Sequence, residues 1–249
     1  AHAGVGTTAL TCSRNQETAD TFAQRHGGAG VTSVDALLDP DRIDAIYIAT
    51  PHAMHRDVAE RALHAGVPVL CEKPMTCCEA DTSALVGASR VTGGPLVEAW
   101  MYRWHPQIEL LVDLVRSDAV GRIEHIEATF GFRAAVDASH RLRNPALGGG
   151  AILDIGGYTM SSAMLVAQAT HPDASIETID ATGALDHTGV DADARCSVAF
   201  SNGLTASLHA TISEDIGTSL RCIGTRGSIE LPCPYLPERT RTGLRGEVR

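Results

Sequence analysis

The chain has 249 residues, a formal net charge of −10 and 44% hydrophobic residues, which suits one large domain or two modest ones. An acidic chain without a basic stripe is a poor binder of nucleic acid or of membrane surfaces. No run approaches the roughly 18 apolar residues of a membrane span, and no charged-then-apolar signal peptide is recognised. The seven cysteines show neither CxxC pairs nor Cys/His ligand spacing, so we expect reduced thiols in the cytoplasm and no metal site.

The first hundred residues alternate between strand and helix patterns. Short apolar runs predict strands over 7–12, 44–49, 67–71 and 95–100. Apolar residues on one helical face, with capping and stop residues, predict helices over 15–26, 33–38, 55–64 and 79–91. This alternation favours a parallel sheet covered by helices.

The pattern changes after residue 100. One helix is predicted over 106–120, and a second begins near Asp154. The remainder predicts antiparallel strands over 123–132, 176–185, 195–200, 204–212 and 220–231, the last broken at 225–227. Ser201-Asn202-Gly203 is a hairpin signal. We therefore predict an α/β protein with two domains, 1–100 and 101–249, the second an α+β domain on a mostly antiparallel open sheet.

Polar residues follow the predicted strands of the first domain, where an open parallel sheet binds its ligands. These strand-end groups are Ser13-Arg14-Asn15, Thr50-Pro51-His52, Glu72-Lys73-Pro74 and Tyr102-Arg103. Each group alone is weak evidence because loops are polar anyway, but together they outline a cleft.

Ser13 and Arg14 carry the sharpest cofactor signal. An acidic residue after the second strand of a dinucleotide fold binds the adenosine ribose hydroxyls, whereas an arginine there suits a 2′-phosphate. No acid follows this strand, so the pair favours NADP, and a solvated pair at a helix start is the alternative.

The phosphate-binding glycine loop should follow a strand that precedes this one. Gly4 to Ala9 match G-x-G-x-x-A, but no strand precedes them and a strand rather than a helix follows. We therefore expect the first strand and its glycine loop, a unit of roughly 25 to 30 residues, to be missing upstream.

A second informative stretch is NPALGGGAILDIGGYTM, residues 144–160. Its three glycines allow a close backbone approach. Asp154 is expected to open a helix, and the i, i+4 spacing places Tyr158 on the same face. A plain N-cap for Asp154 and an amphipathic core role for Tyr158 are the alternatives.

These motifs resemble the Gfo/Idh/MocA oxidoreductases. The shared segments are Ala49-Thr50-Pro51 with His55, Glu72-Lys73-Pro74, EAWMYRWHPQ from Glu98, GGGAILDIGGY from Gly148, GVDADA from Gly189 and GTRGSIEL from Gly224. VLCEKPM and Tyr158 make the chain most similar to the NADP-dependent dihydrodiol and D-xylose dehydrogenase branch. The resemblance implies a Rossmann domain followed by an α+β domain whose open sheet packs against another subunit. It also implies further helices and strands after Gly227.

The resemblance implies roles for individual residues. Lys73 lies between the nicotinamide ribose and the substrate hydroxyl, Glu72 orients it, and Pro74 restricts the turn, for which a cis bond is one route. Tyr158 is the acid/base, helped by the nearby cation, and Asp154 holds a substrate hydroxyl or orients Tyr158. Arg141 and Arg103 are weaker substrate contacts. The cofactor-binding set is Ser13, Arg14, Ala49, Thr50, Pro51, His55, Glu72, Lys73 and Arg103.

The sequence thus predicts an NADP-dependent oxidoreductase acting on a sugar or related cyclic polyol. A nicotinamide-dependent glycosidase on the same fold and a non-catalytic binding protein or fragment are the alternatives. A homodimer or larger assembly is expected, because the strand over 204–212 alternates between Ala206, Leu208 and Ala210 on one face and Thr205, Ser207 and His209 on the other. The first face can pack on helices, and the second is left for a partner subunit.

Overall fold

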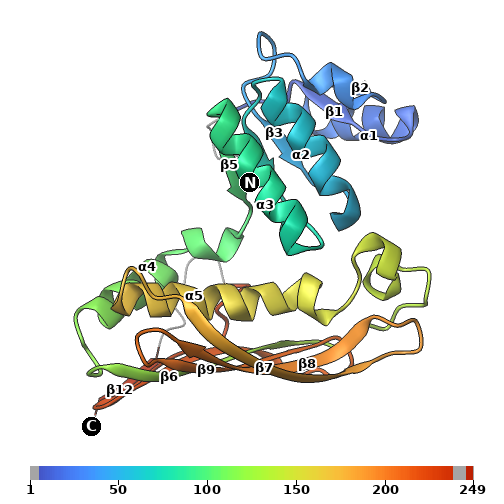
Figure 1. The fold of residues 1–249 in the computed structure, drawn as a ribbon. Coiled ribbons are helices and arrows are strands. Elements are labelled where there is room, and N and C mark those ends of the chain that lie inside the picture. Colours follow the sequence, from blue (N-terminus) through green and yellow to red (C-terminus); the bar gives the residue numbers. More distant parts are fainter. Residues whose placement is uncertain (1–5, 238–244, 249) are drawn as a thin grey trace. The chain divides into compact units, whose positions relative to one another are not determined.

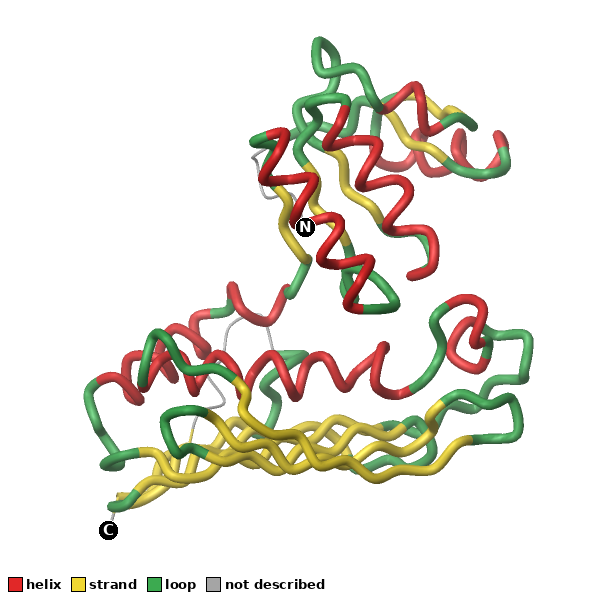
Figure 2. The backbone as a smooth tube through the Cα atoms, in the orientation of Figure 1, coloured by secondary structure: helices red, strands yellow, loops and turns green. Residues whose placement is uncertain are grey.

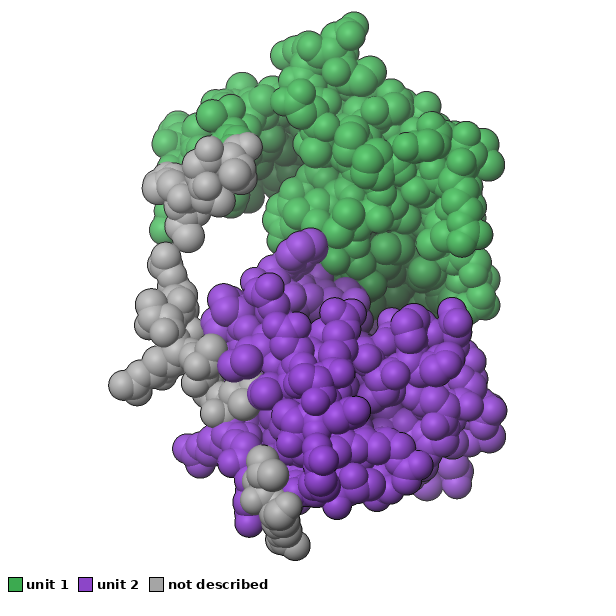
Figure 3. Space-filling model, turned by 90° about the vertical axis from the view of Figure 1, so that its left-hand side faces the viewer, with its two compact units in different colours: residues 1–99 green, residues 100–249 purple. Residues whose placement is uncertain are grey.

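The computed structural model describes residues 6–237 and 245–248, and the chain divides into two compact units, 1–99 and 100–249 (Figure 3). The first unit is α/β and the second is α+β, so the fold class predicted from the sequence is confirmed.

The described residues of the first unit form two parallel sheets. One pairs β1 (Leu10–Cys12) with β2 (Ala29–Val31), and the other has the order β3 (Ile46–Ile48), β4 (Val69–Cys71), β5 (Leu96–Glu98). The helices are α1 (Gln16–His26), α2 (His55–His64) and α3 (Glu79–Thr92), with short 3₁₀ turns at Val34–Leu37 and His52–Met54 (Figures 1 and 2). The Gly4–Ala9 motif begins outside the described residues, and residues 7–9 lead directly into β1.

Local sequence explains the helix boundaries of this unit. The Asn15 side chain accepts from the Thr18 N–H at the start of α1, and Gly27, with φ +94°, follows its end. The predicted inward face of α2 is buried in the core, which comprises Val58, Ala59, Ala62 and Leu63 with strand residues such as Ile48 and Val69. The apolar face predicted for the helix over 15–26 comprises Ala19, Phe22 and Ala23, but only the two alanines are buried. Phe22 is 49% exposed and packs on the His26 ring.

The described residues of the second unit form a seven-stranded sheet of order β12-β11-β10-β6-β9-β8-β7. Its strands are β6 (Ile123–Gly131), β7 (Ile176–Leu185), β8 (Asp191–Phe200), β9 (Thr205–Thr211), β10 (Gly217–Gly224), β11 (Gly227–Leu231) and β12 (Arg245–Val248). The pairs are antiparallel except β6 with β9, which is parallel. Residues 201–203 form the expected hairpin between β8 and β9.

Two helices lie along one face of this sheet, α4 (Pro106–Arg116) and α5 (Gly157–Thr170) (Figures 1 and 2). On β9, Ala206, Leu208 and Ala210 are buried in the core as predicted. On the opposite face Thr205 and Ser207 are exposed, whereas His209 is only partly exposed. The helix predicted over 106–120 ends earlier, because Asp118 adopts φ 51°, which no right-handed helix allows.

One helical stretch of the described residues, Pro145–Thr170, is long and apolar enough for a membrane span by length and composition alone. Sequence reading did not single it out as such. Its helix α5 packs on the seven-stranded sheet and buries Ala163, Val166 and Ala167 in the core. This burial is what a core helix of a globular unit shows, so the stretch is weak evidence for a membrane.

Candidate functional site

Ser13 and Arg14 directly follow β1, as predicted. The Ser13 backbone N–H donates to the Val31 carbonyl at 3.1 Å, which extends the pairing of β1 with β2. The Arg14 side chain is exposed, and it makes no hydrogen bond or ion pair with another residue that the structure describes. Its guanidinium is therefore available to an anionic ligand.

His55 links the segments that follow β3 and β4. Its ring is fully buried, with Nε2 2.8 Å from the Thr50 carbonyl oxygen and Nδ1 2.9 Å from the Pro74 carbonyl oxygen. Both partners are carbonyl oxygens, and the tautomer of the ring decides which of the two accepts its N–H. The Thr50-Pro51 and Lys73-Pro74 segments are thus held at a fixed separation by one side chain.

The backbone at Lys73 is fixed by carboxylates. Glu72 accepts from the Tyr47 hydroxyl at 2.5 Å and from the Lys73 backbone N–H at 3.2 Å, and the Lys73–Pro74 peptide bond is cis. Glu98, at the end of β5, accepts from the Met75 N–H at 2.8 Å. Burial and the bond to Glu72 raise the pKa of Tyr47 to about 12.

Sequence reasoning gave no role to Tyr47 or Glu98. The alternation in DAIYIA, which places Ile46 and Ile48 in the core and Tyr47 on the opposite face, could have found the tyrosine.

Thr50 has a different environment: its hydroxyl oxygen is buried and has no hydrogen-bond partner among the described residues. A buried hydroxyl without a partner is uncommon and marks a place where a ligand group can bind.

In the second unit, the three glycines allow the close backbone approach that the sequence predicted. A Cβ on Gly149 would lie 2.7 Å from the carbonyl oxygens of Arg141 and Leu142. Gly148 and Gly150 have φ values of +73° and +113°, which favour glycine. The chain therefore folds back on the 3₁₀ turn Arg141–Arg143 before the next helix begins.

Asp154 does not open its helix, and in this the sequence expectation was wrong. The helix begins with a π-helical turn, Ile152–Gly156, which contains Asp154 and continues into α5. Such turns insert an extra residue into a helix and occur frequently at functional sites. The Asp154 side chain is 8% exposed and accepts from Arg141 Nη1 at 3.1 Å, so two of the predicted substrate residues contact one another.

Tyr158 lies in an aromatic cluster and is 6% exposed. The cluster surrounds its ring with Trp100, Tyr102, Phe130 and Tyr235, whose centroids lie 4.9, 5.8, 5.5 and 5.3 Å away. A Cβ on Gly157 would approach Trp100 to 2.7 Å, so this glycine allows the indole to pack on the start of α5. The cluster fixes the phenol ring in an environment that excludes water.

Tyr102 and Arg103 are placed differently from the expectation that they end a strand. β5 stops at Glu98, and both residues belong to a 3₁₀ turn, Met101–Trp104, in the second unit. Tyr102 is buried with its hydroxyl 2.8 Å from Ser161 Oγ, while Arg103 donates to the Ser161 carbonyl at 3.1 Å. They pack this turn against α5.

Two family descriptions match the chain. "Oxidoreductase family, NAD-binding Rossmann fold" covers residues 3–99, and "GFO/IDH/MocA C-terminal domain" covers residues 108–230. Together they account for both units in the order in which they occur.

Curated relatives show the same likeness. The chain is 34% identical over 221 residues to trans-1,2-dihydrobenzene-1,2-diol dehydrogenase of Xenopus laevis, covering 88% of this chain and 65% of that protein. It is 36% identical over 158 residues to D-xylose 1-dehydrogenase (NADP(+)) 2 of Haloferax volcanii, covering 63% and 48%. The chain thus spans about two thirds or less of the length of these relatives.

Solved structures agree with this fold. A variant of a 3-ketoreductase from Actinomadura kijaniata, in complex with TDP-benzene and NADP, aligns with a TM-score of 0.84 and 26% identity, covering 97% of this chain and 75% of that one. An aldose-aldose oxidoreductase from Caulobacter crescentus, complexed with glycerol, aligns with a TM-score of 0.81 and 26% identity, covering 97% and 74%.

Proposed function

Because the chain belongs to the Gfo/Idh/MocA oxidoreductase family, we propose that it transfers a hydride between NADP(H) and a hydroxyl-bearing or carbonyl carbon of a sugar or related cyclic polyol. The names of the relatives support this substrate class, since they include dihydrodiol, xylose and dTDP-sugar enzymes. We place the enzyme in the cytoplasm, in keeping with seven cysteines that are all unpaired in the structure.

The residues of the first unit fit NADP. Arg14 and Ser13 follow β1, where a guanidinium and a hydroxyl can bind a 2′-phosphate, and Arg14 is not engaged by any other described side chain. The buried hydroxyl of Thr50 needs a partner, which a polar group of the cofactor would supply. When bound, the nicotinamide accepts or donates the hydride.

The chain's own residues handle the proton and the substrate oxygen. Lys73, whose backbone N–H donates to the Glu72 carboxylate, supplies a positive charge that stabilises a developing alkoxide. Tyr158 gives or takes the proton of the substrate oxygen. Asp154, with Arg141 on its outer oxygen, accepts from a second substrate hydroxyl and so sets the orientation of the ring.

One observation carries this proposal: a buried tyrosine and a buried aspartate, paired with a half-exposed arginine, share the start of one helix. A plain N-cap aspartate would precede the helix, whereas Asp154 lies inside its first turn. The alternative for Tyr158 is a purely structural role in the aromatic cluster. Tyr235, whose hydroxyl is 3.0 Å from Ser162 Oγ, is a tyrosine of that structural kind in the same cluster and serves as the comparison.

The test is the formation of NADPH, followed at 340 nm, with a panel of aldoses and cyclic polyols. Tyr158→Phe and Lys73→Met should each lower kcat by about a hundredfold to ten-thousandfold, the range of general acid–base catalysis. The matched control is Tyr235→Phe, which removes a buried hydroxyl from the same cluster and should leave kcat within about twofold of the parent. A Tyr158→Phe variant as active as the control would overturn the assignment.

The same assay separates the alternative of a nicotinamide-dependent glycosidase. A glycosidase releases a sugar from a glycoside without net formation of NADPH, whereas the proposed dehydrogenase forms one NADPH for each sugar oxidised. Hydrolysis of nitrophenyl glycosides without NADPH would favour the glycosidase.

We also propose that the protein assembles as a homodimer or larger oligomer through the seven-stranded sheet. Helices α4 and α5 lie on one face, while Thr205 and Ser207 are exposed on the other (Figure 1). Polar and charged side chains on that face already contact one another within it, Arg221 with Glu127 at 3.5 Å and His209 with Asp193 at 2.8 Å. A face whose polar side chains are already paired can pack on its own copy about a twofold axis.

A further inference from the structure

The helix that carries Asp154 and Tyr158 begins without a capping side chain of its own. Ala151 occupies the capping position and offers no side-chain acceptor to the first backbone N–H groups. Asp191, 39 residues further along the chain, takes that place: its Oδ2 accepts from the Ile152 N–H at 2.6 Å. A carboxylate at this position also complements the positive end of the helix dipole.

The glycine before the helix is required by this contact. Gly150 has φ +113°, and a Cβ added to it would collide with the Asp191 carboxylate. Its own amide donates to the Leu142 carbonyl at 3.0 Å, and its carbonyl accepts from the Asp154 N–H at 3.2 Å. The backbone thus passes closely between the carboxylate and the 3₁₀ turn that carries Arg141.

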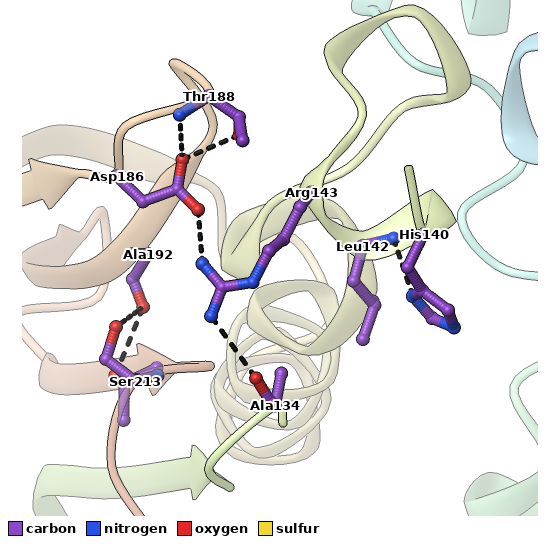
Figure 4. A network of polar contacts seen from close by, with 9 residues as sticks. Ala134, His140, Leu142, Arg143, Asp186, Thr188, Ala192 and Ser213 are labelled. Atoms are coloured by element: carbon purple, nitrogen blue, oxygen red, sulfur yellow. Dashed lines mark hydrogen bonds and ion pairs between the residues drawn. The ribbon is translucent and has the colours of Figure 1, made fainter. Parts of the chain in front are cut away.

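Hydrogen bonds hold the β7–β8 hairpin before and after Asp191, and Figure 4 shows those of Asp186 and Ala192. Before it, Asp186 accepts from Arg143 Nη1 at 2.5 Å and from the Thr188 N–H at 2.7 Å. After it, the Ala192 carbonyl accepts from Thr211 Oγ1 at 3.1 Å. The segment from the Arg141–Arg143 turn to the helix start is therefore joined to the β7–β8 hairpin at two points, Arg143 with Asp186 and Ile152 with Asp191.

We propose that Asp191 is a positioning residue, which caps the helix from the neighbouring strand and thereby sets the π-helical turn that aims Asp154 and Tyr158. This role rests on the proposed function, because Asp154 and Tyr158 are the residues through which Asp191 would act. Sequence reading noted Asp191 within GVDADA but gave it no role.

The electrostatics favour a role beyond stability. Burial raises the pKa of Asp191, although hydrogen bonds from the backbone of residues 151, 152 and 191 act in the opposite direction. A raised carboxyl pKa means that burial outweighs the favourable contacts with the helix start, so folding disfavours the ionised form and the charge opposes the stability of the unit. Asparagine, uncharged and of the same shape, should therefore leave the melting temperature unchanged or raise it.

The experiment compares Asp191→Asn and Asp191→Ala with the parent protein. Loss of the acceptor in Asp191→Ala should lower kcat by about tenfold or more, because Asp154 and Tyr158 would no longer be held in the orientation that the reaction needs. The dissociation constant for NADP should stay within about twofold, since the residues proposed to bind it, Arg103 apart, lie in the first unit. Asp191→Asn keeps an oxygen that can accept from Ile152, and it should recover part of the loss in kcat.

Asp193→Asn is the matched control on the same strand. Asp193 pairs with His209 and Arg195 rather than with the helix, so its variant weakens β8 without removing the cap. It should retain the parent's kcat. A loss of activity in Asp193→Asn equal to that in Asp191→Ala would mean that any damage to β8 suffices, and would overturn the positioning role.

Amide hydrogen exchange provides a readout that needs no substrate. The amides of residues 151–158 should exchange about tenfold faster or more in Asp191→Ala, with β9 and β10 unchanged. Unchanged exchange in the helix start refutes the cap, and faster exchange with full activity refutes the positioning role. If Asp191→Ala does not fold, Asp191→Asn decides by the same two measurements. A parent that oxidises no sugar refutes the proposed function, while the exchange data still decide whether Asp191 holds the helix.

Discussion

Removing either partner of the Arg143–Asp186 ion pair should destabilise the second unit far more than removing one partner of an exposed ion pair would. The two side chains are only 18% and 9% exposed, and Nη2 of Arg143 also donates to the Ala134 carbonyl at 3.2 Å (Figure 4). The Arg143 Nε atom is buried without a partner among the described residues, so the guanidinium depends on Asp186 and Ala134 for compensation. Loss of one member of a buried pair leaves the other charge uncompensated, which costs about 3–5 kcal/mol.

The design is a double-mutant cycle of Arg143→Met, Asp186→Asn and both together. Each single change should lower the free energy of unfolding by about 3 kcal/mol or more, and the double change by about the same amount rather than by the sum. Both tryptophans, Trp100 and Trp104, belong to the second unit, so their fluorescence in urea reports the unfolding of this unit. Single changes whose costs add to within about 0.5 kcal/mol would refute the coupling.

The pH dependence gives a second check. Burial by itself would raise the pKa of Asp186, but the Thr188 hydrogen bonds and Arg143 outweigh it, and the pKa lies below its ordinary value. The native state therefore binds this proton less tightly than the unfolded state does. The stabilisation is present above the ordinary aspartate pKa of about 4 and is lost as pH falls through the lower folded value. The coupling should thus be the same at pH 7 and pH 5.

Three further predictions follow from individual residues. Arg14→Ala should weaken NADP binding about tenfold to a hundredfold while leaving NAD binding unchanged, as measured by calorimetry, and equal losses for both cofactors would contradict the 2′-phosphate role. Iodoacetamide at pH 8 should modify the exposed Cys78 and Cys233 first, because burial raises the pKa of Cys71 and Cys222 to about 12; mass spectrometry of early labelling at either buried thiol would be the contrary result. Light scattering at micromolar concentration should give the mass of a dimer or larger species, and the double variant Thr205→Glu/Ser207→Glu should lower that mass. A monomeric parent would exclude the assembly, and an unchanged mass in the variant would exclude this surface.

Elements with a strong local period could be predicted from the sequence alone. The helix of residues 55–64 buries Val58, Ala59, Ala62 and Leu63 as its 3.6-residue period required, and β9 divides its side chains by a period of two. The Gfo/Idh/MocA motifs identified the family, and the two family descriptions confirm it. The hydrophobic period suffices to predict these elements because the backbone of a helix or a strand repeats at the same spacing in any fold.

Short strands and irregular helix starts could not be predicted in this way. β2 has three residues, two of them alanine and glycine, and its pairing with β1 rather than any local preference makes it a strand. Asp154 was expected to open a helix, but the π-helical turn begins two residues earlier. The parallel pairing of β6 with β9 is likewise a choice among partners far apart in the chain.

What the sequence by itself determined is therefore the order and type of the longer elements and the polar residues that follow β1, β3 and β4. The tertiary structure alone decided which distant groups complete them: Asp191 caps a helix 39 residues away, and Asp186 neutralises Arg143 from 43 residues away. The physical reason is that a cap or a buried counter-charge can come from any strand that the fold brings near. A local pattern shows that such a group is needed, whereas only the packed chain shows which residue supplies it.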